Sequence, residues 1–313
     1  MTTTGPAELT LIQVSDTHLV PRGQLVHDRI DTFALLETVA AAVAASSGPV
    51  AGILLTGDLA NDGAPEAYHR LRSVIEPLAE RLGAPVVYAM GNHDERAPFR
   101  AELLGGAPCA SAPGASTGTG SGAGSPAAST GLPEDPCDLV HDINGLRIVV
   151  LDSTTPGRHD GWLTDAQLGW LAEVLDTPAP RGTLLVVHHP PLPSPVPTAH
   201  LLRLASAQRL AKVIDGSDVR MVLSGHSHHA GAGSIAGIPV WICPALAYQV
   251  DGLPPAGRHR GLTTGGFSRI DLIDGQFVAT AVPLEDCGEL YNRDAAEWME
   301  FIRSVTPTTN PAA

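Results

Sequence analysis

Five short apolar stretches of this sequence each end in a residue type that binds metal ions. The stretches 9–14, 53–55, 86–90, 184–187 and 221–223 run into aspartate, asparagine or histidine within a few residues. A short apolar run bounded by turn residues is typical of a buried strand, and in open α/β sheets the functional groups lie just beyond the carboxyl ends of the strands. The candidate ligands are Asp16, His18, Asp58, Asn92, His188, His226 and His228. We expect them to meet in one metal site at one sheet edge.

The chemistry of these side chains indicates which metals and which reaction to expect. Carboxylate, amide and imidazole donors suit manganese, iron, cobalt or zinc, and the set contains no cysteine. These donors are too many for one tetrahedral ion, whereas two ions that share a carboxylate would use them all. Such two-metal centres hold both oxygens of an in-line phosphoryl displacement and lower the pKa of bound water. The predicted reaction is hydrolysis of a phosphate ester by a metal-bridging hydroxide.

Helices that alternate with these strands must position the ligands. In the first half, leucine and valine at helical spacing predict helices over 31–45 and 65–82. Pro65 opens the second of these helices and Gly83 follows its end, which is the usual placement of the two residues. Strands that alternate with helices in this way indicate βαβ units around a central sheet.

The second half is predicted to contain a hairpin, further helices and more strands. Asn144–Gly145 between two apolar runs predicts the hairpin, and Thr164 is the expected N-cap of a helix. The helices are expected over 163–175, 205–214 and 298–302, and the strands over 238–243, 267–273 and 277–282. These elements together predict an α/β fold in which two packed sheets carry helices outside.

A low-complexity stretch interrupts the pattern. All but three residues from 105 to 134 are glycine, alanine, serine, threonine or proline. Such a composition offers too little apolar surface to offset the entropy of ordering the chain. We therefore predict a flexible insertion over 105–136 within a single domain that spans 1–283. We predict that 284–313 forms a C-terminal helix and a disordered tail.

Charge and cysteine usage set limits on partners and location. The chain has 19 lysine and arginine residues against 33 acidic ones, a net charge of −14, which argues against a nucleic-acid partner. No signal peptide or membrane-spanning apolar run is evident, so we expect a cytoplasmic protein without an integral membrane segment. Cys109, Cys137, Cys243 and Cys287 form no C-x-x-C pair. A reducing cytoplasm argues against a disulfide between the two that flank the insertion, and we expect free thiols.

The strand-end motifs also form a recognisable series. They are Asp16-x-His18, Gly57-Asp58, Gly91-Asn92-His93-Asp94, His188-x-Pro190 and Gly225-His226-x-His228. This series resembles the signature of the calcineurin-like metallophosphoesterases. Within that superfamily the chain most resembles the bacterial class III cyclic-nucleotide phosphodiesterases, over approximately 9–282 outside the insertion. The resemblance implies a four-layer α-β-β-α sandwich of two mixed sheets flanked by helices.

The resemblance further implies a role for each residue. One metal ion would be held by Asp16, His18 and His228. The other would be held by Asn92, His188 and His226, with Asp58 as the bridge between the two ions. Asn92 and His93 would be the catalytic residues, with His93 outside both coordination shells and near the phosphate and leaving group. The implied ions are iron or manganese ahead of zinc or cobalt, and the implied oligomer is a homodimer.

Several functions share this metal signature. The leading prediction is a phosphodiesterase for small molecules, with 3′,5′-cyclic AMP and other cyclic nucleotides first. A glycerophosphodiester phosphodiesterase is the main alternative, and the run from Gly161 to Thr164 is also familiar there. The acidic composition ranks a nuclease lower. A non-catalytic scaffold with this fold would be expected to have lost ligands, and this sequence retains every one of them.

Overall fold

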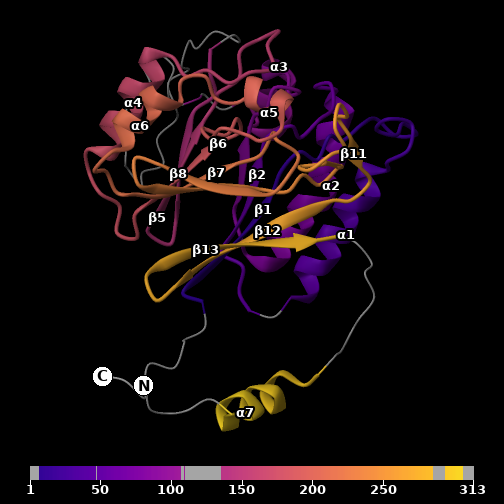
Figure 1. The fold of residues 1–313 in the computed structure, drawn as a ribbon, viewed down its shortest axis with the longest axis vertical. Helices are drawn as coiled ribbons and strands as arrows, with labels where there is room; N and C mark the ends of the chain where they lie inside the picture. The colour runs from indigo at the N-terminus through magenta and orange to yellow at the C-terminus, as the bar shows by residue number, and fades with distance from the viewer. Residues whose placement is uncertain (1–6, 47, 107–108, 110–134, 285–292, 306–313) are drawn as a thin grey trace.

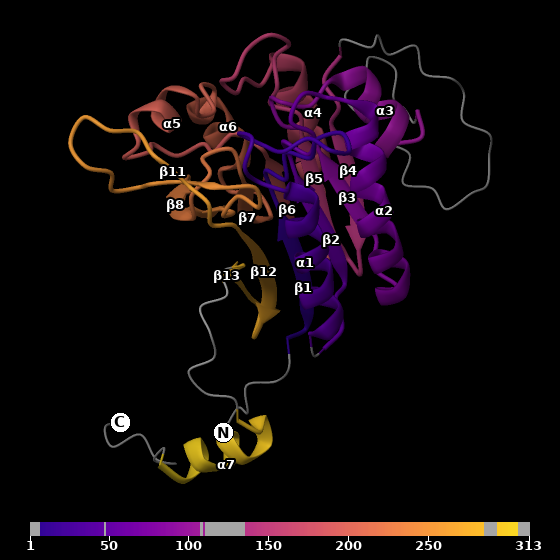
Figure 2. The ribbon, with the colours of Figure 1, turned by 90° about the vertical axis from the view of Figure 1, so that its right-hand side faces the viewer.

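Two large β-sheets form the centre of the computed structural model (Figures 1 and 2), which describes residues 7–46, 48–106, 109, 135–284 and 293–305. The first sheet has the order β13-β12-β1-β2-β3 and the second β4-β5-β6-β7-β9-β8. The strands are β1 Leu9–Val14, β2 Gly52–Thr56, β3 Val86–Ala89, β4 Leu139–Ile143, β5 Leu146–Leu151, β6 Thr183–Val187, β7 Val219–Ser224, β8 Gly231–Ile235, β9 Ile238–Ile242, β10 Gln249–Val250, β11 Gly261–Leu262, β12 Gly266–Ile273 and β13 Gln276–Pro283. The helices are α1 Thr32–Ala45, α2 Pro65–Leu82, α3 Arg96–Leu103, α4 Asp165–Leu175, α5 Pro197–Leu201, α6 Ala207–Ile214 and α7 Ala295–Val305.

Apolar side chains cover both faces of the central strands of each large sheet. In β6, Leu184 and Val186 face the other sheet, whereas Leu185 and Val187 pack in the cluster that contains α4 and α6. On the far side, α1 and α2 cover the sheet that contains β1 and β2. Because successive side chains of a strand point to opposite faces, a strand buried on both faces must be apolar throughout. The predicted four-layer α-β-β-α sandwich is confirmed.

Parallel pairing brings the candidate ligands to one edge. β1, β2 and β3 run parallel in one sheet, and β5, β6, β7 and β9 run parallel in the other. The two sheets also connect just beyond β1, where Ser15 forms an isolated parallel bridge with Ala245. Parallel strands place their carboxyl ends at the same edge of a sheet, so the loops after β1, β2, β3, β6 and β7 converge there.

Local signals placed most helix ends correctly. Asp31 caps α1 by accepting from the Ala34 N–H, and Thr164 forms a capping box with Gln167 at the start of α4. The helix predicted over 205–214 begins at Ala207, because Ser206 already occupies the N-cap position. The helix predicted over 298–302 is longer, and none of its side chains is buried. Both views place α7 away from the two sheets.

Some elements lack a periodic apolar signal and were not predicted. These are the helices α3 and α5 and the strands β8, β10 and β11. α3 buries only Phe99, and the five residues of β8 include two glycines and no fully buried side chain. Most of the predicted insertion and of the predicted C-terminal tail lies outside the described residues. Within the described ranges, no helix is long and apolar enough to cross a membrane.

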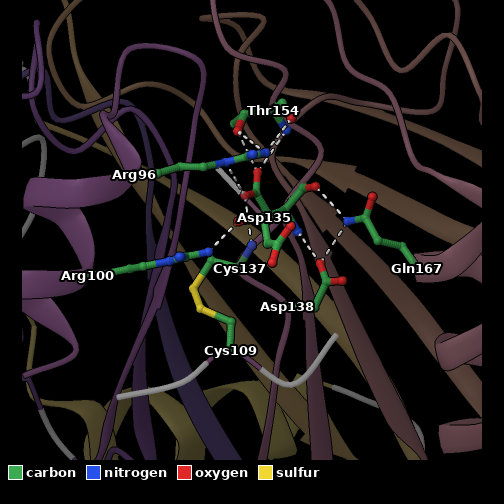
Figure 3. The surroundings of a disulfide bond; sticks show 9 residues. Arg96, Arg100, Cys109, Asp135, Cys137, Asp138, Thr154 and Gln167 are labelled. Carbon is green, nitrogen blue, oxygen red and sulfur yellow. Dashed lines mark hydrogen bonds and ion pairs between the residues drawn. A yellow bond between two sulfur atoms is a disulfide. The ribbon is translucent and has the colours of Figure 1, made fainter. Parts of the chain in front are cut away.

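The expectation of free thiols is wrong for two of the four cysteines. Cys109 and Cys137 form a disulfide (Figure 3). They are 28 positions apart in sequence, but both lie buried in the cluster beneath α1 and α2, with Cα atoms 4.9 Å apart. The fold therefore brings the two ends of the insertion together, which sequence spacing did not reveal. Cys243 is a buried free thiol, and Cys287 lies outside the described residues.

The disulfide lies beside a buried polar network. The Cys137 N–H donates to Asp152 Oδ2 at 2.9 Å, and Arg96 Nε pairs with the same oxygen at 3.2 Å (Figure 3). Asp152 Oδ1 accepts from the Thr154 N–H and hydroxyl group. Since α3, which carries Arg96, follows the Gly91–Asp94 loop directly, this network ties that loop to the end of β5.

Candidate metal centre

The structure brings the candidate ligands of five separate loops together. Six of the seven fall into two groups whose potential ligand atoms lie within 4.8 Å of one another. One group contains Asp16, His18, Asp58 and His228, and the other contains Asp58, His188 and His226. Asp58 belongs to both groups, which is the position expected of a bridging carboxylate. Asn92 offers an amide oxygen, and it comes from the loop after β3 in the same pocket.

The loops hold five of these ligands in a left-handed backbone conformation. The φ angles are 54° at Asp16, 43° at His18, 51° at Asp58, 67° at His226 and 52° at His228. Positive φ is uncommon outside glycine, although aspartate and histidine adopt it more readily than most residues. Strained backbone costs free energy and clusters at functional sites, where surrounding structure maintains it. Each turn directs a polar side chain into the cluster instead of out to solvent.

Backbone carbonyls fix the ring orientation of two histidines. His188 Nδ1 donates to Thr56 O at 2.8 Å, and His228 Nδ1 donates to Tyr248 O at 3.0 Å. A carbonyl can only accept, so Nδ1 carries a proton in both rings and Nε2 is the nitrogen that faces the cluster. Metal-binding histidines commonly use their second nitrogen in this way. Gly91 leaves the space required, because a Cβ atom there would lie 2.7 Å from His188 Nε2 and closer still to Asp58.

Opposing charges dominate the electrostatics of the cluster. Burial raises the pKa of Asp16. Burial would also raise the pKa of Asp58, but His188 and His18 outweigh it and hold that pKa well below its usual range. Burial would lower the pKa of His188, but Asp58 and Asp16 outweigh it and raise the value to about 9. A proton on His188 thus supplies the positive charge that two buried carboxylates require.

The remaining imidazoles are held in the form that binds metals. Burial lowers the pKa values of His18, His226 and His228, so these rings are neutral near pH 7. His18 Nε2 and His228 Nε2 face each other at 3.1 Å. Within the described part of the chain, His188 Nε2 and Asn92 Oδ1 are buried and have no hydrogen-bond partner. Buried polar atoms normally have partners, so these converging atoms fit metal ions as the missing ones.

His93 lies beside the cluster and in neither ligand group. Its backbone N–H donates to Asp58 Oδ1 at 2.8 Å, and its Nδ1 donates to Asn61 O at 2.8 Å. The ring lines the same pocket as Asp58 and lies 4.7 Å from the ring of His18. With Nδ1 engaged, Nε2 is the atom that can exchange a proton with a bound molecule.

Asp94 supports the site, although its sequence position predicted no role for it. Its buried carboxylate accepts from the N–H groups of Leu59, Ala60 and Gly91 and from the Tyr68 hydroxyl group. These bonds tie the loop that carries Asp58 to the loop that carries Asn92. Burial, with a smaller contribution from Asp58, raises the pKa of Asp94 to about 6. Its position next to the Asn-His pair was the available signal, but its partners became evident only in the fold.

Two neighbouring histidines have different surroundings. His189 is buried, and its Nδ1 lies 2.7 Å from the Ser153 hydroxyl oxygen while its Nε2 lies 3.2 Å from His159 O. Burial holds its pKa well below the usual value. His159 itself lines the pocket and contacts the side chain of Asn92. Of the adjacent pair, His188 belongs to a ligand group and His189 does not.

Fold and cluster together define a dimetal phosphoesterase. The chain belongs to the calcineurin-like phosphoesterase family, whose sequence model matches residues 9–230. The expected resemblance is therefore confirmed at the family level.

Individual relatives extend over most of the chain. It is 38% identical over 275 residues to a probable cyclic nucleotide phosphodiesterase of Rhodococcus erythropolis, covering 88% of this chain and 83% of the relative. It is 37% identical over 278 residues to a cAMP/cGMP dual specificity phosphodiesterase of Mycobacterium tuberculosis, covering 88% and 80%. A solved dimetal phosphatase from Danio rerio shares the fold, with a TM-score of 0.56 at 13% identity, covering 88% of this chain and 99% of that one.

Proposed function

We propose that this protein is a metal-dependent phosphodiesterase that hydrolyses 3′,5′-cyclic nucleotides, with cyclic AMP first. The observation that carries the proposal is the pair of ligand groups that share Asp58 and open into one pocket. The names of the Rhodococcus and Mycobacterium relatives support the choice of cyclic nucleotides as the substrate class. The substrate is a small phosphodiester.

We assign the ligands as follows. Asp16, His18 and His228 would hold one ion, and Asn92, His188 and His226 would hold the other. Asp58 belongs to both ligand groups and would be shared between the ions. Manganese or iron is the proposed metal, since the donors are oxygen and nitrogen atoms of intermediate softness. Bound metal ions would supply a nucleophile from water near neutral pH and neutralise charge on the phosphate.

The residues of the chain have separate tasks in this reaction. Asp16 and Asp58 provide the negative charge that keeps cations in the cluster, and the carbonyls of Thr56 and Tyr248 keep two imidazole rings in the ligand orientation. His93 is the general acid in this proposal. Because its Nδ1 donates to Asn61 O, its Nε2 delivers the proton to the departing alkoxide.

A hydrolysis panel tests the proposed substrate class. Manganese-loaded protein is assayed with cyclic AMP, cyclic GMP, a 2′,3′-cyclic nucleotide, glycerophosphoethanolamine, bis-p-nitrophenyl phosphate and a phosphate monoester. We expect the highest kcat/KM on a 3′,5′-cyclic nucleotide. A higher kcat/KM on glycerophosphoethanolamine would instead establish the glycerophosphodiester alternative. The cytoplasmic location and the homodimer stay predictions, and fractionation of cells and analytical ultracentrifugation test them.

A further inference from the structure

The pocket above the metal centre has two chemically different sides. One side consists of Asp58, Asn92, His93, His226 and His228. The other side comes from two elements that the metal ligands do not use. They are α5 with its C-cap residue Leu202, and the hairpin over 249–262, which contains β10 and β11 and contributes Val250 and His259 to the lining. Both views show α5 beside this hairpin.

The size of the pocket limits how much of a substrate it encloses. Its volume is about 200 Å³, which is smaller than the roughly 300 Å³ at which pockets for drug-sized ligands begin. A phosphate held at the cluster, with the sugar attached to it, would take up much of this volume. The rest of the molecule would then extend toward the more exposed lining residues. Among these, Leu202 exposes 36% of its surface to solvent and Val250 is half-buried.

The charge of the lining also restricts the ligand. No lysine or arginine is among the described residues that line this pocket. A second phosphate group would find no lysine or arginine side chain to pair with. An uncharged group would lose little hydration free energy when it leaves water. An apolar contact suits the flat face of a nucleobase, because burial of apolar area is favourable and requires no directed bond.

The aromatic residue directly before the hairpin, Tyr248, already has partners. The Tyr248 ring lies 4.3 Å from the ring of His228 and 5.1 Å from the ring of His27, measured between centroids. Its carbonyl oxygen accepts from His228 Nδ1. Tyr248 therefore supports a metal ligand, and it is not assigned to the nucleobase.

We propose that Leu202 and Val250 form the apolar contact for the nucleobase of the substrate and thereby favour phosphodiesters that carry a base over those that carry none. This inference rests on the proposed hydrolysis of cyclic nucleotides. Leu202 and Val250 come from different elements and lie away from the metal ligands in sequence. The Val250 N–H donates to the His228 carbonyl oxygen at 2.7 Å, but this is a backbone contact that a change of the Val250 side chain retains. We therefore expect the two side chains to act on binding of the base and not on the phosphate site. Since apolar contacts do not read the edge of a base, adenine and guanine are held alike.

The test compares two inhibitors that differ only in the base. AMP and ribose 5-phosphate are assayed as competitive inhibitors of the hydrolysis of bis-p-nitrophenyl phosphate by the manganese-loaded full chain. The variants are Leu202→Ser and Val250→Ser. The matched control is Leu201→Ser, because Leu201 is the adjacent leucine, is 76% exposed and is not among the pocket residues. Thermal melting and metal content verify that each variant is folded and loaded.

We expect AMP to inhibit the wild-type protein more strongly than ribose 5-phosphate. In Leu202→Ser, inhibition by AMP should weaken about 5- to 20-fold, a range that overlaps the lower part of what one apolar contact contributes in a hydrophobic pocket. Inhibition by ribose 5-phosphate should change less than about twofold, within the range of a surface substitution, and Leu201→Ser should change neither. Val250→Ser should follow Leu202→Ser.

Three results would overturn the assignment. One is equal inhibition by AMP and ribose 5-phosphate in the wild-type protein. Another is equal weakening of both inhibitors by Leu202→Ser, which would place its effect on the phosphate site. The third is an unchanged preference for AMP in both variants. Because the reporter is not a cyclic nucleotide, the result stays separate from the substrate panel. If the substrate panel shows no hydrolysis of cyclic nucleotides, the proposed function is refuted. The inhibition data would still decide whether Leu202 and Val250 contact the base.

Discussion

The amide nitrogen of Asn92 lies 3.1 Å from Nδ1 of His159. An amide NH₂ group can only donate, so His159 Nδ1 accepts, and a neutral His159 ring carries its proton on Nε2. This contact fixes which end of the Asn92 side chain points toward the cluster. Oδ1 is left buried and without a hydrogen-bond partner among the described residues, as a metal ligand requires.

Loss of this contact should weaken metal binding. In His159→Ala the Asn92 amide is free to rotate, and we expect the affinity for one of two metal ions to fall about 10-fold, as substitutions behind a ligand commonly do. Chelator competition with metal analysis measures this affinity. His159→Asn should restore most of it, because its Oδ1 can replace the Nδ1 acceptor. His259→Ala removes another pocket histidine and should leave the affinity unchanged. Equal losses in the alanine and asparagine variants would contradict the proposed contact.

The shared carboxylate should determine the number of bound metals. Asp58 Oδ2 lies 3.6 Å from His18 Nε2 and 3.4 Å from His188 Nε2, so this carboxylate is close to a histidine of each ligand group. We expect two ions per chain in the wild-type protein, loss of at least one ion in Asp58→Ala and a fall in activity of at least about 100-fold. Elemental analysis of stripped and reloaded protein is the measurement. The exposed Asp62→Ala is the control, and a single tight ion that survives in Asp58→Ala would refute the bridge.

The role of His93 should depend on the leaving group. General acid catalysis contributes about 10²–10⁴-fold, so His93→Ala should lose activity of that order on cyclic AMP while both metal ions are retained. The loss should be smaller for bis-p-nitrophenyl phosphate, because its leaving group is already a stable anion. Steady-state kinetics on both substrates measure the ratio. Equal losses would assign His93 to positioning of the phosphate, and loss of a metal would make it a ligand.

Metal affinity should rise with pH. Asp58 and Asp16 raise the pKa of His188 to about 9 in the metal-free protein, so below that pH the ring carries a proton. A ligand histidine must be neutral, and its proton must leave when a metal binds. Affinity should therefore increase from pH 6 toward pH 9, on the order of tenfold per pH unit from this group alone. Titration calorimetry in buffers of different ionisation enthalpy counts the protons. Metal binding at pH 7 without proton release would contradict the protonated His188.

The disulfide should contribute to stability, whereas the sequence that it encloses should not. Replacing both Cys109 and Cys137 by serine should destabilise the protein by about 2–4 kcal/mol, which is typical of a cross-link that closes a loop of this length. Deleting 111–131 with both cysteines retained should leave stability nearly unchanged, because a stretch of small and polar residues cannot supply core area. Thermal melting under non-reducing conditions compares the two variants. A larger loss from the deletion would show that the insertion is structural.

The sequence alone determined the fold class and the set of ligand types. Runs such as 184–187 are apolar at every position because both faces of β6 are buried, and this signal is local. The ends of α2 could be predicted for the same reason, since Pro65 and the left-handed Gly83 act on their own neighbours. The ordered series of polar residues after the strands was visible without coordinates, and it indicated a metal site.

Only the tertiary structure decided which of these residues touch and how they are held. Asp16 and His228 are more than 200 positions apart, yet His228 Nε2 lies 3.4 Å from Asp16 Oδ1, because the loops after β1 and β7 meet where the two sheets join. The contacts of Asp94 and of His159 and the Cys109–Cys137 disulfide depend equally on distant segments. Residue types and the periodic spacing of apolar residues predict secondary structure and chemistry. Hydrogen bonds and ion pairs between remote loops depend instead on the packing of the sheets.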